Sequence, residues 1–98
     1  MSDDPSSLWY VYIIETDQQT LYTGIAKNIE QRFQEHLAMH EGKPGAKGAK
    51  FFRGAQPVQV VYRESLENRS LASKREYAIK KMARAKKLAL IRGSIVFS

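Results

Sequence analysis

The chain has 98 residues, of which 43% are hydrophobic and 27% charged, a composition typical of one globular domain with a single core. It contains no cysteine, which excludes a disulfide framework, a thiolate metal site and a cysteine nucleophile. No apolar run approaches the ~20 residues of a membrane span, and the N-terminus is acidic and polar rather than signal-like. We therefore expect a soluble, cytoplasmic protein that does not bind a membrane.

The net charge of +6 is distributed unevenly along the chain. Residues 1–40 carry two basic and six acidic side chains, whereas residues 41–98 carry fourteen basic and four acidic ones. The first part therefore has a net charge of −4 and the second a net charge of +10. This asymmetry favours a polyanionic partner, most simply nucleic acid, although solvated lysines alone produce the same balance.

Two strands are predicted at the start of the chain. Residues 9–14 are aromatic and β-branched, and residues 20–24 read as a second, shorter strand. The five polar residues between them suit an antiparallel hairpin, whereas a parallel crossover needs about a dozen or more. Tyr12 and Tyr22 share one face of this hairpin if their pairing centres on Asp17, and a plain two-residue turn would separate them.

A helix is predicted over residues 28–40. Asn28 is a good N-cap, and the side chain of Gln31 can return a hydrogen bond to the cap. The buried stripe of this helix consists of apolar side chains that recur every four residues: Ile29, Phe33 and Leu37. Arg32 and His36 project beside this stripe, so neither is expected to lie on the solvated far face.

A basic loop and a third strand follow. Residues 41–50 contain three glycines, one proline and three lysines without an apolar period, which indicates a mobile loop. Residues 51–54 are expected to close the loop with a short helical turn. Residues 57–62 predict a strand whose proline stands first, where the missing N–H donor is tolerated.

Two basic helices complete the predicted order of elements. The first runs over residues 69–82 with Asn68 as its cap, and the second runs over residues 84–92 and is ended by Gly93. One face of the first of these helices combines a carboxylate with small or apolar side chains: Ala72, Glu76, Ile79 and Ala83. A carboxylate in such surroundings needs a strong partner, because burying an unpaired charge is costly.

The predicted elements carry two tyrosine-containing tripeptides, an arginine and a glutamate, in that order along the chain. The tripeptides Tyr-Val-Tyr at 10–12 and Tyr-Thr-Gly at 22–24 are followed by Arg32 and then, beyond the third strand, by Glu76. Over about residues 8–92 the chain resembles the GIY-YIG endonuclease superfamily, and its small standalone bacterial members most closely. In that family the tripeptides lie on a leading hairpin, the arginine on the next helix and a metal-binding glutamate on a later helix.

The resemblance implies an α/β fold with a small three-stranded, mainly antiparallel sheet flanked by helices. It implies one nuclease domain over residues 8–92, between a disordered tail at 1–7 and a C-terminal tail at 93–98. The implied function is that of a metal-dependent endonuclease that hydrolyses phosphodiester bonds in nucleic acid, with DNA favoured over RNA. The implied cofactor is Mg²⁺ or Mn²⁺, and the oligomeric state stays open.

By the same resemblance, Tyr12, Tyr22, Arg32, His36 and Glu76 form the catalytic site. A single carboxylate such as Glu76 suits Mg²⁺, which keeps several waters and takes phosphate oxygens as ligands. Arg32 offers a planar donor fork for phosphate. Either tyrosine can act as the base once a cation or a hydrogen bond favours its phenolate, and the resemblance favours Tyr12. His36 is expected to pack, to form hydrogen bonds and to assist phosphate binding rather than to ligate a metal.

Seven basic side chains are expected to contact phosphates: Lys27, Lys47, Lys50, Arg53, Lys74, Lys80 and Lys81. A lysine that is common after the second glycine in some branches of the family is Ile25 here, which leaves Lys27 or Lys47 as its replacement. Tyr10 and Thr23 also depart from the family's tripeptides, and these two departures are expected to change packing only.

Plainer interpretations account for the same residues. Strand tyrosines often pack their rings and leave the hydroxyl in water. Arg32 can pair with Glu35 at i+3, Glu76 can pair with Lys80 at i+4, and the lysine loop can be a simple linker. The alternative function is therefore a nucleic-acid-binding module with weak or lost cleavage, and a weaker alternative is a scaffold that recruits an acidic partner protein.

Overall fold

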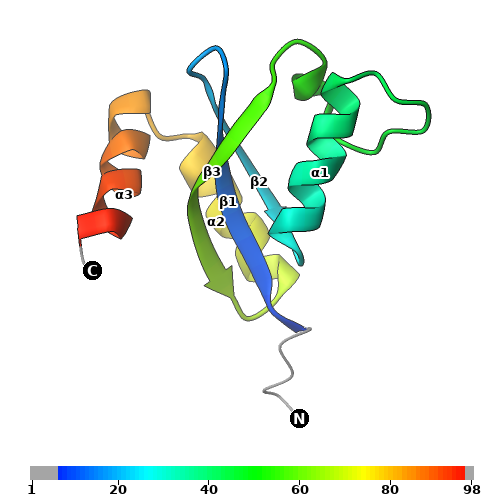
Figure 1. Cartoon of the computed structure of the whole chain (residues 1–98). Coiled ribbons are helices and arrows are strands. Elements are labelled where there is room, and N and C mark those ends of the chain that lie inside the picture. Colours follow the sequence, from blue (N-terminus) through cyan, green and yellow to red (C-terminus); the bar gives the residue numbers. More distant parts are fainter. Residues whose placement is uncertain (1–6, 97–98) are drawn as a thin grey trace.

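The sheet has three antiparallel strands, the first strand of the chain lies between the second and the third, and helices cover the sheet. A computed structural model describes residues 7–96 of the chain, with side chains for residues 7–93. Its elements are β1 (Trp9–Thr16), β2 (Leu21–Ala26), α1 (Ile29–His40), η2 (Lys50–Arg53), β3 (Pro57–Leu66), α2 (Arg69–Lys80) and α3 (Arg84–Val96) (Figure 1). This arrangement confirms the predicted α/β fold and the predicted order of its elements.

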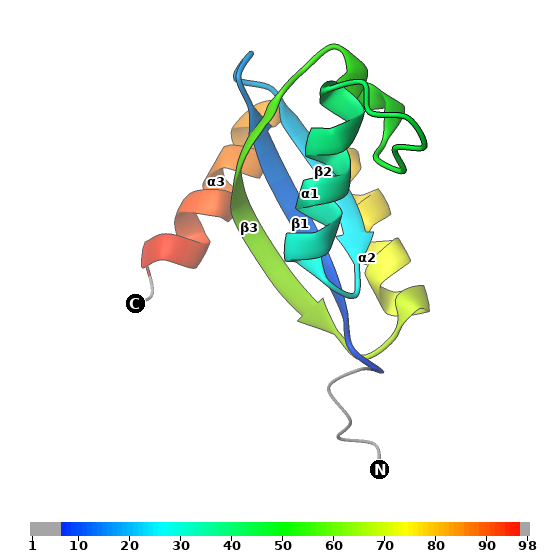
Figure 2. The ribbon, with the colours of Figure 1, turned by 45° about the vertical axis from the view of Figure 1, so that its right-hand side comes forward.

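The central strand β1 divides the core into two clusters, because its side chains alternate between the faces of the sheet. Val11 and Ile13 pack against α2 and α3 on one face. Tyr12 and Ile14 pack against α1 and η2 on the other face. Figure 2 shows α1 and α2 on opposite sides of the sheet, with β2 as the edge strand between them.

The β1–β2 hairpin places both tyrosines on the face that α1 covers, but its register differs from the expected one. Tyr12 lies opposite Gly24 and Tyr22 lies opposite Ile14, so the pairing centres on Gln18 rather than on Asp17. The reason is the turn itself: the N–H of Thr16 donates to the carbonyl of Thr20 (3.0 Å), and Gln19 adopts a positive φ of 63°. A shift of the centre by one residue moves each pairing by two, which leaves the faces unchanged.

Both predicted N-caps form. The N–H of Gln31 donates to Asn28 Oδ1 (3.0 Å), and the N–H of Leu71 donates to Asn68 Oδ1 (2.9 Å). The predicted return bond from Gln31 to the cap does not form, because its side-chain amide donates to Glu35 one turn further along (3.4 Å). Each helix therefore begins where the sequence predicts.

Several predicted boundaries are wrong, and the first is that of β1, which continues to Thr16 rather than to residue 14. β2 continues to Ala26 and β3 to Leu66, because pairing with β1 extends both strands. α2 ends at Lys80, so Ala83 is an exposed residue between two helices and does not share the face of Glu76. α3 continues through Gly93 to Val96, because Gly93 does not adopt the positive φ that ends a helix.

The tail predicted at 1–7 lies outside the described residues except for Ser7. Within the described part of the chain, no helix combines the length and the apolar character that crossing a membrane requires.

Candidate active site

A cleft of about 590 Å³ runs along the edge strand β2, between α1 and α2. Its lining includes four of the five predicted catalytic residues: Tyr12, Tyr22, Arg32 and Glu76. The fifth, His36, is fully buried and contacts Tyr12 from α1. The structure thus brings together five side chains that lie between positions 12 and 76 of the chain.

Gly24 provides the space in which the Tyr12 ring lies. A Cβ at position 24 would stand 2.5 Å from the Tyr12 hydroxyl and 2.7 Å from its Cζ. It would also stand 3.1 Å from a ring carbon of Tyr22. The glycine of the second tripeptide is therefore required by the tyrosine of the first, which crosses it from the neighbouring strand.

Tyr22 is held by an aromatic cluster on the α1 side of the sheet. Its ring centroid lies 4.8 Å from that of Phe52, 5.3 Å from that of Phe51 and 5.4 Å from that of His36. Phe52 is fully buried, whereas Phe51 is 44% exposed beside the cleft. The short η2 turn therefore holds the Tyr22 ring in place, a role that its sequence did not suggest.

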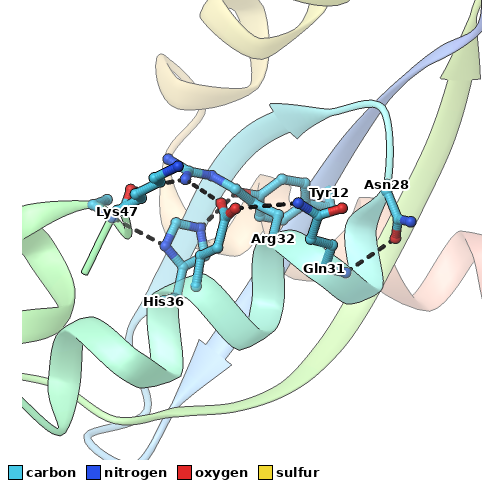
Figure 3. Close-up of polar contacts among 8 residues, drawn as sticks. Tyr12, Asn28, Gln31, Arg32, His36 and Lys47 are labelled. Carbon is cyan, nitrogen blue, oxygen red and sulfur yellow. Dashed lines mark hydrogen bonds and ion pairs between the residues drawn. The ribbon is translucent and has the colours of Figure 1, made fainter. Parts of the chain in front are cut away.

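The Tyr12 hydroxyl and His36 Nε2 are 2.8 Å apart, and the surroundings of the imidazole determine which of them donates (Figure 3). The N–H of Ala49 donates to His36 Nδ1 (3.1 Å), so Nδ1 carries no proton. Burial lowers the pKa of His36 to about 4, so the ring is neutral at pH 7. Its one proton is therefore on Nε2, which donates to the hydroxyl oxygen of Tyr12.

The two tyrosines are phenols, not phenolates, in the free protein. Burial raises the pKa of Tyr12 well above its usual range, and the nearby Tyr22 acts in the same direction. Burial also raises the pKa of Tyr22, against the opposing charges of Lys80 and Arg32. A tyrosine base here needs further positive charge before it can lose its proton.

Arg32 makes two side-chain hydrogen bonds through Nη1. That atom donates to Glu35 Oε1 (2.7 Å) and to the carbonyl of Lys47 (2.9 Å), as Figure 3 shows. The predicted i,i+3 pair with Glu35 therefore exists. The positive charge of Arg32 still acts on Tyr12, where it lowers the pKa against the effect of burial. Arg32 is thus both an ion-pair partner and a cation of the cleft.

Glu76 reaches the cleft from α2, with 22% of its side chain exposed. Its carboxylate lies 3.1 Å from Lys80 Nζ, so the predicted i,i+4 pair also forms. Over residues 7–96 no group of three histidine, aspartate or glutamate side chains is arranged to hold a metal ion. A cation at Glu76 would therefore have one protein carboxylate and would take its other ligands from water and phosphate, which fits Mg²⁺.

The loop predicted to be mobile is attached to α1 along residues 47–49. The carbonyl of Lys47 and the N–H of Ala49 bond to the side chains of Arg32 and His36. Between them, Gly48 is buried, and a Cβ there would stand 2.6 Å from His36 Cα. The backbone of this segment therefore belongs to the site, although its lysines suggested only a role for side chains.

The predicted phosphate contacts do not all lie at the cleft. Lys27 lines it, and the charge of Lys80 acts on Tyr22 inside it. Arg53 instead borders a separate hollow beside the end of α1, and Lys81 lies over the ring of Tyr77 (4.9 Å). The remaining predicted contacts are exposed side chains outside the lining of the cleft: Lys47, Lys50 and Lys74.

Trp9 and Arg69 also line the cleft, although the sequence did not indicate a role for either of them at the site. Trp9 immediately precedes the first tripeptide, and Arg69 is the first residue of α2. A cation at a helix N-terminus is unfavourable because of the helix dipole, and this was the available signal that Arg69 has another role.

Comparison with known proteins agrees with this geometry. The chain matches the model of the GIY-YIG catalytic domain over residues 8–89 and therefore belongs to that family, whose fold is that of a nuclease. Its similar proteins include small UPF0213 proteins. That of Desulfotalea psychrophila is 46% identical over 86 residues, 88% of this chain and 73% of that protein. That of Syntrophus aciditrophicus is 47% identical over 83 residues, 85% and 88% respectively.

A solved structure is also similar. The solution NMR structure of a UPF0213 protein from Bacillus halodurans has a TM-score of 0.52 and 27% sequence identity to this chain. The match covers 87% of this chain and 83% of that one.

Proposed function

We propose that this protein is an endonuclease that hydrolyses phosphodiester bonds in nucleic acid, with DNA favoured, and that it uses Mg²⁺ or Mn²⁺. One observation carries the proposal: a buried tyrosine hydroxyl that accepts a hydrogen bond from a neutral histidine faces a cleft lined by Arg32 and Glu76. These residues supply the parts that hydrolysis needs, which are a proton acceptor, a phosphate-binding cation and a carboxylate for a divalent ion.

In this proposal Tyr12 takes the proton of the attacking water after losing its own. His36 Nε2–H donates to the phenolic oxygen, which stabilises the phenolate. His36 cannot accept the proton of Tyr12, because Nε2 is already protonated and Nδ1 accepts from the Ala49 N–H. The tyrosine proton therefore passes to solvent water in the cleft.

Arg32 and Glu76 act on the phosphate. Arg32 neutralises charge on the phosphoryl oxygens as the water oxygen bonds to phosphorus and the bond to the leaving oxygen breaks. Glu76 would hold the divalent cation, which when bound supplies further positive charge beside these oxygens.

The test compares wild type, Glu76→Gln and Lys80→Gln on labelled DNA and RNA structures, with Mg²⁺, with Mn²⁺ and with EDTA. Both variants break the same ion pair, but only Glu76→Gln removes the carboxylate. We expect metal-dependent cleavage by wild type and by Lys80→Gln. Glu76→Gln should bind nucleic acid in EDTA but lose cleavage by at least about a hundredfold, the effect expected of a main electrostatic catalytic group. Normal cleavage by Glu76→Gln would refute the assignment.

A second candidate function is nucleic-acid binding without cleavage. The raised pKa of Tyr12 favours it, since a neutral phenol is a poor base. In that case all three proteins bind, and none cuts any substrate with either metal.

A further inference from the structure

Trp9, Lys27 and Arg69 form a cluster at one end of the cleft. They come from the start of β1, from the β2–α1 connection and from the start of α2, and all three line the cleft. Lys27 Nζ lies 5.9 Å from the centroid of the Trp9 ring, and the Arg69 guanidinium carbon lies 5.4 Å from it. Both distances are within the range of a cation–π interaction.

These two cations differ from the others of the cleft in their partners. Arg32 is paired with Glu35 (2.7 Å), and Lys80 is paired with Glu76 (3.1 Å). Among the ion pairs of residues 7–96, neither Lys27 nor Arg69 has a carboxylate within 4.0 Å. An aromatic ring orients a cation without neutralising it, so two positive charges remain here for an anion.

The position of the cluster relates it to the catalytic residues. Figure 3 shows Asn28 at one end of a row along α1, with Arg32 further along and His36 and Lys47 at the other end. Lys27 precedes Asn28, so the cluster lies at the Asn28 end. Four helical residues rise ~6 Å, and a DNA strand advances about 3.4 Å per nucleotide. A phosphate at the cluster and a phosphate at Arg32 can therefore belong to nearby nucleotides of one strand.

We propose that Trp9, Lys27 and Arg69 form a subsite for a backbone phosphate of the nucleic-acid strand, beside the bond that is cut. This inference rests on the proposed function and goes beyond it, because it states where the flanking strand lies. The subsite selects phosphate rather than base sequence, since both cations recognise a charge that every nucleotide carries. The strand then leaves the site over the start of α2, away from the lysine loop.

The test measures binding of an unlabelled oligonucleotide in EDTA, where cleavage is not needed. Trp9 is the single tryptophan of the chain, so its emission reports on this subsite alone. We expect the emission to change on binding. Lys27→Gln and Arg69→Gln should each lower the magnitude of the slope of log affinity against log salt by ~0.7 to 0.9. Both side chains are exposed, so the substitutions leave the core intact.

The matched controls are Arg84→Gln and Lys86→Gln, which remove exposed cations from α3 and should keep the wild-type slope. If the Lys27 and Arg69 variants also keep that slope, or if the Trp9 emission is constant while the oligonucleotide binds, the subsite is refuted and the proposed nuclease function is unaffected. If wild type neither binds nor cuts any nucleic acid, the proposed function and the subsite both fail.

Discussion

His36 has a different hydrogen-bond partner on each ring nitrogen, and these partners define its chemistry. A backbone N–H at Nδ1 leaves the proton on Nε2, where it stabilises the oxygen of Tyr12. The same burial that keeps the ring neutral also raises the pKa of Tyr12. The free site therefore contains no charged base. A bound substrate or cation must supply the electrostatic field that favours the phenolate of Tyr12.

The buried imidazole predicts a pH dependence of stability. Its pKa of about 4 in the folded chain is below the ordinary value of 6.5, so between these values only the unfolded chain binds the proton. The contribution is fully present above pH 6.5 and is lost as the pH falls toward 4, by roughly 3 kcal/mol in total. Denaturant melts at pH 7.0 and pH 5.0 measure most of this loss.

The control for this experiment is the other histidine. His36→Gln should flatten the profile between pH 7.0 and 5.0, whereas His40→Gln should retain it. Retention of the full wild-type loss by His36→Gln would show that His36 does not cause it.

The hydroxyl of Thr23 makes no stabilising contact that the described structure shows. Its Oγ1 is buried and has no hydrogen-bond partner among the described residues. Thr23→Val keeps the shape and removes the polar atom, so the free energy of unfolding should rise by ~1 kcal/mol. Thr16→Val should instead lower it by a similar amount, because Thr16 Oγ1 bonds to Thr20 Oγ1 (2.6 Å) and accepts from the N–H of Gln18. Equal effects of the two substitutions would contradict this explanation.

At the scale of elements, the segment at 47–49 and helix α1 act as one unit. The segment reaches α1 through two hydrogen bonds, to Arg32 and His36, and through the close approach of Gly48. Positioning of the Arg32 and His36 side chains therefore depends on backbone groups of a loop, which ordinary alanine substitution of its lysines does not remove.

Gly48→Ala tests this unit. The added Cβ would meet backbone atoms of α1, which cannot move aside as a flexible side chain can. We expect a loss of ~1–3 kcal/mol in stability and a partial return of the His36 proton to Nδ1, seen in the ring ¹⁵N chemical shifts.

The control is Gly54→Ala, where the Cβ meets nothing within 4 Å and φ is −107°. It should change stability by less than about 0.5 kcal/mol and leave the ring shifts unchanged. Wild-type ¹⁵N shifts in Gly48→Ala would show that the segment does not select the tautomer.

At the scale of the whole molecule, the cleft follows the β2 edge of the sheet, between α1 and α2, while α3 lies on the far side of the sheet from α1 (Figure 1). All of the excess positive charge belongs to residues 41–98, which include the loop, η2 and α2. Of these basic side chains Arg69 lines the cleft and the charge of Lys80 acts inside it, so part of the excess charge lies where a polyanion would bind.

The lysine loop gives a prediction at this scale. Lys47 and Lys50 are exposed on either side of the segment that bonds to Arg32 and His36, so under the proposed function the double alanine variant should lower the magnitude of the salt slope by ~0.7 to 0.9 for each lysine. Their replacement leaves the backbone carbonyl of Lys47 on Arg32 intact. A slope equal to that of the Arg84 and Lys86 controls would make the loop a linker whose backbone alone matters.

The sequence by itself determined the order of elements, the N-caps and the five residues of the candidate site. These follow from local rules, since capping and hydrophobic periodicity depend on neighbours along the chain, and from a family order of tyrosine, arginine and glutamate. Tertiary structure decided the rest. Pairing with β1 extended β2 and β3, a turn at Gln18 set the register, and close packing attached Gly48 to α1. The proton on His36 Nε2 and the two cations over Trp9 depend on groups 13 to 60 positions apart, which only folding brings within contact.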